Sequence, residues 1–197
     1  MLQTRRLLLR EWKDEDVDAF ARMNDEPRVV RYLGQLADRT AIEAWRTHQR
    51  DHFRMYGYGI WVLEDLGAGG CIGFCGLMNI PYQTHFTPAV EIAWRLDPEY
   101  WGRGYATEAA SAALSFGFER IGLGEVVAYA FVENLASRRV MERLGMSHDP
   151  QDDFDLPGGV EALRRQVLYR LKAGDWLKDG VCRKDLSSNR GNEENKQ

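Results

Sequence analysis

The stretch "EIAWRLDPEYWGRGYATEAA", residues 91–110, contains the change from strand to helix that decides the fold. Its first six residues place an apolar side chain at every second position, which is typical of a strand, and Pro98 ends that strand. The alanine-rich residues that follow predict a helix of about four turns ending near Ile121. Between the two elements, Gly102 and Gly104 leave the backbone bare at the entrance to the helix.

This glycine pair predicts an anion-binding loop. The amides in the first turn of a helix have no intrahelical acceptor, and the helix dipole adds partial positive charge there. Glycine lets the backbone approach a phosphate closely and adopt positive φ, and Arg103 could supply a further cation. A tight turn that only joins a strand to a helix would use the same residues, so that alternative stays open.

Two other phosphate-binding motifs do not fit this loop. The chain contains no Gly-Lys-Ser or Gly-Lys-Thr sequence, which excludes a P-loop. A dinucleotide fingerprint would need a third glycine where Thr107 stands, and the acidic residue would have to be Glu133, which lies too far downstream. An NAD(P)-dependent oxidoreductase is therefore a distant alternative.

The rest of the chain predicts one α/β domain over residues 1–176. Strands adjoin helices without strict alternation, which indicates a mixed sheet with helices on both faces. Residues 177–197 are polar and nearly free of large apolar side chains, so we expect a disordered tail. Strands are expected from Arg6 and at residues 58–65, 71–80, 89–98, 125–132 and 162–171. The second and third of these strands form a predicted hairpin. Helices are expected from Asp14 to a stop before Pro27, at residues 40–56, up to Ile121 and from Asn134.

Composition restricts the class of protein. The chain has 197 residues, 44% hydrophobic residues and a formal charge of −4, which argue for a globular protein and against a general nucleic-acid binder. No apolar run approaches the ~20 residues that cross a bilayer and no secretory signal is evident, so we expect a cytoplasmic protein without a membrane partner. On one strand, Cys71 and Cys75 would lie about 13 Å apart, too far for a disulfide.

Taken with "NLASRRVMERLGM", residues 134–146, the stretch at 91–110 resembles the GNAT superfamily of acetyl-CoA-dependent N-acetyltransferases, and within it the RimJ/RimL-like, ribosomal-protein alanine acetyltransferase type. The similarity runs from Arg6 to about Trp176. It implies a mixed, mainly antiparallel, splayed sheet of about six or seven strands with helices on both faces. Trp101 stands where the family often has Gln or Arg, and Ala106 where it has Gly; binding through main-chain amides tolerates both changes.

The resemblance implies acetyl-CoA as the acetyl donor, with its pyrophosphate on the glycine loop and its pantetheine arm along the preceding strand. The strand would bind this arm through main-chain groups, as if a strand were added. Asn134 would contribute from the start of the next helix. The cofactor-binding residues implied in this way are Trp94, Leu96, Trp101, Gly102, Arg103, Gly104, Tyr105, Ala106, Thr107, Asn134 and Ser137.

Acetyl transfer needs an uncharged amine, a polarised thioester carbonyl and a proton for the departing thiolate. Ser137 is the candidate acid because the resemblance places it beside the thioester sulfur; alternatively it only satisfies amides at the helix end. Glu91 is the candidate base, although a solvent-facing carboxylate would fit the strand pattern equally well. The amide of Ile92 or Ala93 could polarise the carbonyl.

The acceptor is expected to be a primary amine, either a protein N-terminus or a small molecule such as a polyamine or an aminoglycoside. A non-catalytic coenzyme A sensor is the alternative from another class. A homodimer is the commonest assembly for a soluble protein of this kind. His48 and His52, four residues apart on a helix, would suit a metal, but with no third ligand in the sequence we expect none.

Overall fold

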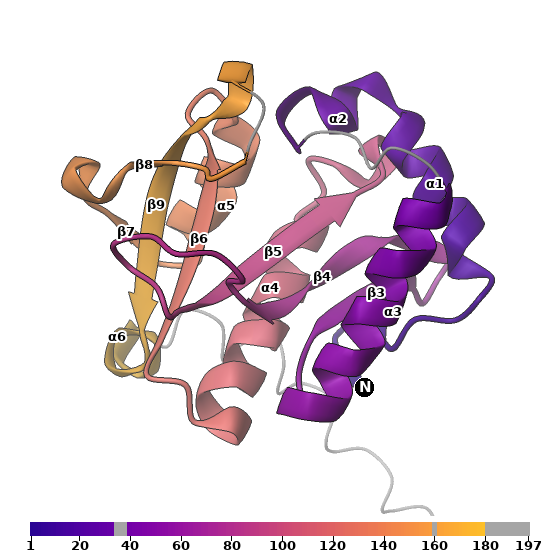
Figure 1. Ribbon diagram of the computed structural model, residues 1–197. Coiled ribbons are helices and arrows are strands. Elements are labelled where there is room, and N and C mark those ends of the chain that lie inside the picture. The colour runs from indigo at the N-terminus through magenta and orange to yellow at the C-terminus, as the bar shows by residue number, and fades with distance from the viewer. Residues whose placement is uncertain (34–38, 159–160, 180–197) are drawn as a thin grey trace, which may run out of the picture.

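The computed structural model describes residues 1–33, 39–158 and 161–179 of the chain (Figure 1). In these residues the strands form one sheet in the order β1-β2-β3-β4-β5-β6-β9-β7, and β8 also pairs with β9. The strands are β1 (Leu2–Gln3), β2 (Leu7–Arg10), β3 (Ile60–Asp65), β4 (Cys71–Asn79), β5 (Val90–Leu96), β6 (Glu125–Phe131), β7 (Ser147–His148), β8 (Phe154–Asp155) and β9 (Arg165–Lys172).

The helices lie on both faces of this sheet, as the pattern of the sequence indicates. Gly117–Ile121 continues α4 as a π turn, so the helical path ends at the residue predicted for it. Short 3-10 segments occupy Pro98–Tyr100, Pro150–Asp152 and Glu161–Leu163. The α-helices are α1 (Asp16–Asp25), α2 (Pro27–Leu33), α3 (Arg39–Tyr56), α4 (Tyr105–Phe116), α5 (Leu135–Arg143) and α6 (Ala173–Asp179).

One pair of neighbouring strands is parallel. β5 and β6 are bridged at Glu91 and Val127, whereas the other pairings in the described sheet are antiparallel. Beyond that bridge the two strands diverge, and Figure 1 shows the gap widening toward the end of β5. The predicted splay is therefore present in the sheet, and it lies where the glycine loop and α5 begin.

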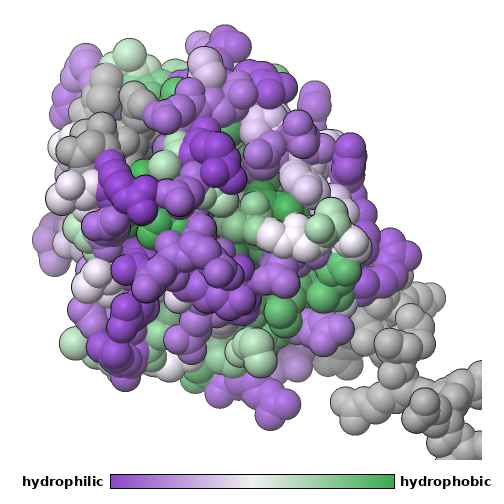
Figure 2. All heavy atoms as spheres, turned by 90° about the vertical axis from the view of Figure 1, so that its right-hand side faces the viewer, coloured by the Kyte–Doolittle hydropathy of each residue, from purple (hydrophilic) through white to green (hydrophobic). Residues whose placement is uncertain are grey.

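Each face of the sheet has its own apolar core. Ala109, Ala113 and Leu114 of α4 pack with residues of β4, β5 and β6 in the largest cluster. Phe20 of α1 and Ile42 of α3 pack on the opposite face, with residues of β3 and β4. Seen from the side of α1 and α3, the surface is mainly hydrophilic, with hydrophobic atoms grouped in its recesses (Figure 2).

The predicted hairpin of β3 and β4 is confirmed, but three details of the prediction are wrong. Asp14 does not cap the first helix; this helix begins at Asp16, and the exposed Asp14 pairs with Arg46 instead. Over the described residues the sheet has nine strands rather than six or seven, because β1, β7 and β8 contain two residues each and carry no recognisable alternation. Helix α2 was also missed, since Pro27 was interpreted only as a stop; proline is equally suited to the first position of a helix.

The predicted tail, residues 177–197, lies largely outside the described residues. Its first three residues belong to α6, so the helix runs past the boundary predicted at Trp176.

Candidate active site

Two cavities meet where β5 and β6 part. The first, called the loop cavity here, has a volume of about 310 Å³ and lies between the 101–107 loop, α2 and α5. The second, the inner cavity, has a volume of about 400 Å³ and lies between β5, β6 and the residues Leu156, Gly158, Leu163 and Gln166. Every predicted cofactor-binding residue except Arg103 lines the loop cavity. The two cavities share the lining residues Tyr32, Trp94, Arg95 and Ser137.

The glycine loop has the conformation that an anion site needs. Gly102 and Gly104 have φ of 73° and 79°, a region that side chains of L-residues disfavour. The first helical hydrogen bond of α4 runs from the Glu108 amide to the Gly104 carbonyl, 3.0 Å away, so the preceding amides come before the helical ladder. Within the described residues, the buried Thr107 Oγ1 has no hydrogen-bond partner. The loop therefore presents donors to the cavity.

Arg6, which sequence reasoning did not select, holds this loop from outside. Its Nη1 donates to the Arg103 carbonyl at 2.9 Å, and its Nη2 lies 2.7 Å from the Glu108 carboxylate in the first turn of α4. Its guanidinium also lies 4.2 Å from the centre of the Tyr105 ring. The guanidinium of Arg103 lies over the Tyr100 ring, which agrees with its absence from the cavity wall. The loop is thus fixed before any ligand binds.

The main chain of β5 alternates between its two neighbours. Asp97 donates its amide to the Ile72 carbonyl of β4, so the groups of Leu96 and Trp94 point the other way, toward the gap with β6. The Leu96 carbonyl accepts from the indole of Trp101 at 2.8 Å. Trp101 therefore joins the loop to the strand.

Basic side chains surround the loop cavity. Arg28 of α2 and both Arg139 and Arg143 of α5 line it together with Arg95, and no carboxylate is among its described lining residues. In a chain with a formal charge of −4, this local excess of positive charge favours an anionic ligand.

Glu91 lies inside the inner cavity with 6% of its surface exposed, so the solvent-facing interpretation is wrong. Its bridge to Val127 places it beside an apolar cluster that also contains Phe154 and Leu168. Burial raises the pKa of the Glu91 carboxyl to about 7, and the Tyr129 hydroxyl, which favours the charged form, opposes that rise. Glu91 can therefore exchange a proton near neutral pH.

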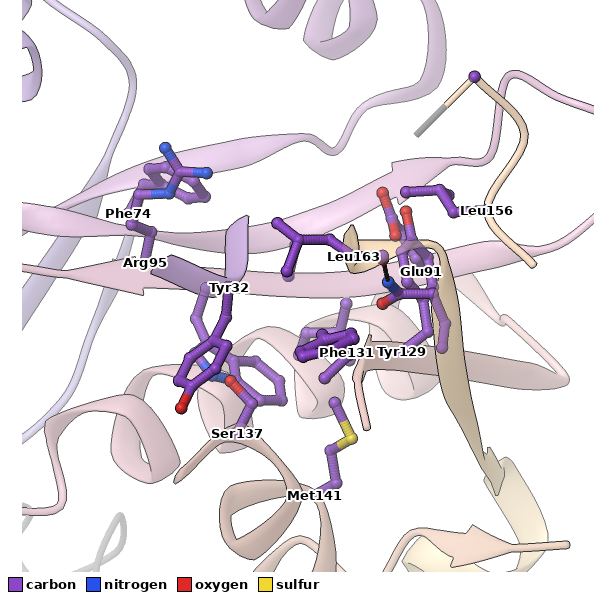
Figure 3. Close-up of a pocket in the computed structure, with 16 residues that line it drawn as sticks. Tyr32, Phe74, Glu91, Arg95, Tyr129, Phe131, Ser137, Met141, Leu156 and Leu163 are labelled. Carbon is purple, nitrogen blue, oxygen red and sulfur yellow. Dashed lines mark hydrogen bonds between the residues drawn. The ribbon is translucent and has the colours of Figure 1, made fainter. Parts of the chain in front are cut away.

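Ser137 and Glu91 come from different elements, Ser137 from α5 and Glu91 from β5. Asn134 caps α5, since its Oδ1 accepts the Ser137 amide at 3.2 Å, and this confirms the predicted start of the helix. Figure 3 shows Ser137 and Tyr32 on one side of the inner cavity and Glu91 with Tyr129 on the other. A reacting group at the junction of the two cavities would have a hydroxyl on one side and a carboxylate on the other.

The inner cavity also includes the two residues whose amides were candidates to polarise a carbonyl. Both Ile92 and Ala93 line it. Because Ala93 is opposite Gly76 and an even number of residues from Asp97, its main-chain groups face β4. Only the amide of Ile92 therefore points toward β6.

Tyr32, Arg95 and Tyr129 line the inner cavity and were not among the predicted site residues. Tyr32 lies in the last turn of α2, the helix that the sequence did not predict, and its ring stacks on Phe131 of β6 with centroids 6.0 Å apart. Arg95 shares the strand alternation of Glu91, which was the one signal available in the sequence. Tyr129 approaches Glu91 only through the pairing of β5 with β6, which no local pattern reveals.

His52 is engaged inside the protein. Its Nε2 accepts the Asn79 amide at 3.1 Å, so Nδ1 carries the proton and donates to the Tyr58 carbonyl at 2.8 Å. Both ring nitrogens are thus used, which opposes the alternative of a metal on His48 and His52. The described residues contain no cluster of three or more His, Cys, Asp or Glu side chains suited to a metal ion.

The fold and site define a class of protein: an α/β protein whose sheet parts around a basic cavity at a helix entrance, continuous with a second cavity that holds a buried carboxylate. Among the helices that the structure describes, none has both the length and the apolar composition needed to cross a membrane.

The chain belongs to the GNAT family of acetyltransferases: residues 6–147 match the family model described as Acetyltransferase (GNAT) domain. The uncharacterized N-acetyltransferase YoaA of Bacillus subtilis is 31% identical over 173 residues, covering 86% of this chain and 89% of the relative. The FsC-acetyl coenzyme A-N(2)-transacetylase of Aspergillus fumigatus is 28% identical over 187 residues, covering 90% and 78%. An acetyltransferase structure from Agrobacterium tumefaciens aligns with a TM-score of 0.71 at 29% identity, covering 86% of this chain and 92% of that one. The predicted fold class is confirmed, and the protein is an N-acetyltransferase.

Stability should depend on pH through His52. Burial lowers its pKa, so the unfolded chain, with an ordinary histidine pKa near ~6.5, binds the proton more readily than the folded chain does. His52 therefore contributes its full stability above the unfolded-chain pKa. The free energy of unfolding should fall as the pH drops below that pKa toward the lower pKa of the folded protein. Urea titrations between neutral pH and pH 5 measure this slope.

His52→Gln should flatten the slope, whereas the matched change at the exposed His48, His48→Gln, should keep most of it, because the charge of His48 is the smallest of the causes that shift the His52 pKa. Equal slopes for wild type and His52→Gln would contradict the assignment.

Proposed function

We propose that the protein transfers an acetyl group from acetyl-CoA directly to a primary amine. The observation that carries the proposal is the continuity of the two cavities, one lined by the glycine loop and the other containing Glu91, with Ser137 where they meet. The residues present suit coenzyme A, because the loop cavity combines an orphaned Thr107 hydroxyl, two positive-φ glycines and arginines. The printed name of the Aspergillus fumigatus relative, which includes acetyl coenzyme A, also supports this donor.

Acetyl-CoA would supply an acetyl group activated as a thioester, and the side chains of this chain would manage the protons. The Glu91 carboxylate accepts a proton from the bound amine, which frees the nitrogen lone pair for attack on the carbonyl carbon. Ser137 supplies a proton to the departing sulfur as the carbon–sulfur bond breaks, and the second proton of the attacking nitrogen passes to the Ser137 oxygen, which restores its hydroxyl. Holding both reactants at the junction of the cavities contributes through proximity.

The cysteines support direct transfer without an acyl-enzyme. Cys71 and Cys75 are free thiols. Burial raises the pKa of Cys71 to about 11 and that of the fully buried Cys75 still further, so neither forms a thiolate near neutral pH. A ternary complex of enzyme, donor and amine therefore fits the site better than a covalent relay.

Family membership sets aside the NAD(P)-dependent oxidoreductase, and the N-acetyltransferase relatives favour an enzyme over a non-catalytic sensor. The narrower RimJ/RimL-like type, with a protein N-terminus as acceptor, rests on the order of the sequence motifs alone.

The function is tested by measuring thermal stabilisation with acetyl-CoA, coenzyme A and NAD(P)H, followed by thiol release with a panel of amines. Stabilisation by NAD(P)H alone would exclude the proposal.

Glu91→Gln should lower kcat by about two to four orders of magnitude, the usual contribution of a positioned base. In the wild type, kcat/KM should rise with pH to a plateau above about 7, because the carboxyl accepts a proton only when ionised. The variant should lose this limb of the pH profile. Glu99→Gln, an exposed carboxylate of the neighbouring turn, is the control and should behave as wild type. A limb that persists in Glu91→Gln would assign the base elsewhere.

Gly104→Val should abolish most of the thermal stabilisation by acetyl-CoA. At φ of 79° an L-residue costs about 1–2 kcal/mol, and the loop can avoid that strain only by moving its donors. Gly122→Val is the matched control, since Gly122 also has φ of 79° but ends the π turn after α4. Both variants should lose stability, whereas only Gly104→Val should lose at least tenfold in affinity for acetyl-CoA by calorimetry. Equal affinity in the two variants would remove the loop from the donor site.

Ser137→Ala should lower kcat by up to about two orders of magnitude, because the hydroxyl acts on the leaving group. The KM for acetyl-CoA should stay nearly unchanged, because the cap of α5 uses the main-chain amide of Ser137 and not its side chain. Steady-state thiol release measures both constants. Ser147→Ala on the exposed strand β7 serves as the control. If kcat is unchanged in Ser137→Ala, Ser137 is not the acid, and its role is limited to the amide that Asn134 accepts at the start of α5.

A further inference from the structure

Arg95 is a half-buried cation without an anionic partner in the described structure. Its Nη1 donates to the neutral Asn24 Oδ1, and its guanidinium lies 5.7 Å from the centre of the Phe74 ring. Its Nε is buried and has no hydrogen-bond partner among the described residues. The ion pairs of these residues do not include Arg95, although the chain pairs many of its other arginines. A half-buried guanidinium whose buried Nε has no partner costs free energy, and a bound anion would recover part of it.

The guanidinium keeps its charge in this setting. Burial lowers the pKa of Arg95 to about 10, which still leaves the group protonated near neutral pH. The charge therefore belongs to the site under working conditions.

Arg95 and Glu91 lie on the same face of β5. Four residues of strand separate them, which places their Cα atoms about 13 Å apart with both side chains on one side of the sheet. Trp94 and Leu96 pack on the opposite face with α4, while Asn24, the partner of Arg95, belongs to α1. In Figure 3 the Arg95 guanidinium lies beside Phe74 and is directed away from Ser137. Arg95 also lines the loop cavity, so it stands at the end of the inner cavity where the two cavities meet.

The inner cavity contains, within its described lining, one acidic and one basic side chain. Among its described lining residues, Glu91 is the one carboxylate and Arg95 the one cation. The wall between them is largely apolar, with Phe131, Leu163 and Met141 on it. A ligand that matches this cavity has an amine at one end, an anion at the other and an apolar chain between them.

We propose that the acetyl acceptor is an amine that also bears an anionic group, such as a carboxylate, several bonds away, with its nitrogen at Glu91 and its anion at Arg95. This inference rests on the proposed function. Figure 3 shows the Arg95 guanidinium directed away from Glu91, toward the other end of the cavity, which disfavours an α-amino acid bound by its own amine and carboxylate, because only one carbon joins those two groups. A polyamine would place a second cation against Arg95, which like-charge repulsion disfavours.

Three acceptors of one length test the proposal. ε-Aminohexanoate has a distal anion, hexylamine a neutral end and hexamethylenediamine a distal cation. In the wild type, kcat/KM for aminohexanoate should exceed that for hexylamine by roughly tenfold to a hundredfold, the value of a charge-assisted hydrogen bond, and the diamine should be the poorest. Arg95→Gln should remove this preference, and Arg95→Lys should keep part of it.

Two measurements separate recognition from folding. Acetyl-CoA should still stabilise Arg95→Gln, because Arg28, Arg139 and Arg143 continue to line the loop cavity, and this shows that the variant folds. Arg54→Gln, which changes an exposed arginine on α3, should retain the wild-type order of acceptors. A wild-type preference for the diamine, or an order that Arg95→Gln leaves unchanged, would overturn the proposal. So would acetylation of other amines with none of the three probes accepted. Failure of acetyl-CoA to stabilise the protein, with no thiol release from any amine, would instead overturn the proposed function and this inference with it.

Discussion

The site depends on the single bridge between β5 and β6. These neighbours are parallel and meet at Glu91 and Val127, after which they diverge. Strands that separate leave main-chain groups unpaired along both edges, and a protein tolerates this only where a cavity or a ligand takes the place of the missing partner. The bridge also buries the Glu91 carboxyl at the narrow end of the gap, which raises its pKa to about 7. One feature of topology thus creates both the two connected cavities and the buried carboxylate in one of them.

The glycine loop is rigid because it is attached on two sides. Arg6 binds the Arg103 carbonyl and the Glu108 carboxylate, and Trp101 donates its indole N–H to the Leu96 carbonyl. A loop whose donors are already in position loses little conformational entropy when an anion binds. This explains how Trp101 can stand where the family often has Gln or Arg, since its indole provides a contact within the protein.

The sequence predicts the strand, loop and helix around residues 91–110 because these signals are local: alternation, a proline stop, glycines and an N-cap at Asn134. It also predicts the residues around the loop cavity, which follow from those elements.

The inner cavity was not predictable in the same way. Arg95 and Tyr129 belong to it through the register of β5 and β6, and Tyr32 through a short helix that Pro27 begins. Such residues are brought together by pairing and packing across long separations in sequence, for which a single sequence carries no period or spacing. The same limit made Glu91 ambiguous between an exposed and a buried carboxylate.

The charges around the inner cavity also bear on how an amine becomes reactive there. A primary amine in water has a pKa near ~10.4, about three pH units above that of Glu91, so proton transfer between them would be unfavourable by roughly 4 kcal/mol. Two features of the site reduce this difference. The largely apolar walls disfavour the charged ammonium, and the positive charge of Arg95 acts on it in the same direction. An acceptor whose anion pairs with Arg95 partly cancels that second effect, so desolvation by the walls must supply most of the change. The burial that holds Glu91 near neutrality therefore also lowers the proton affinity of the amine, and both pKa values move toward each other.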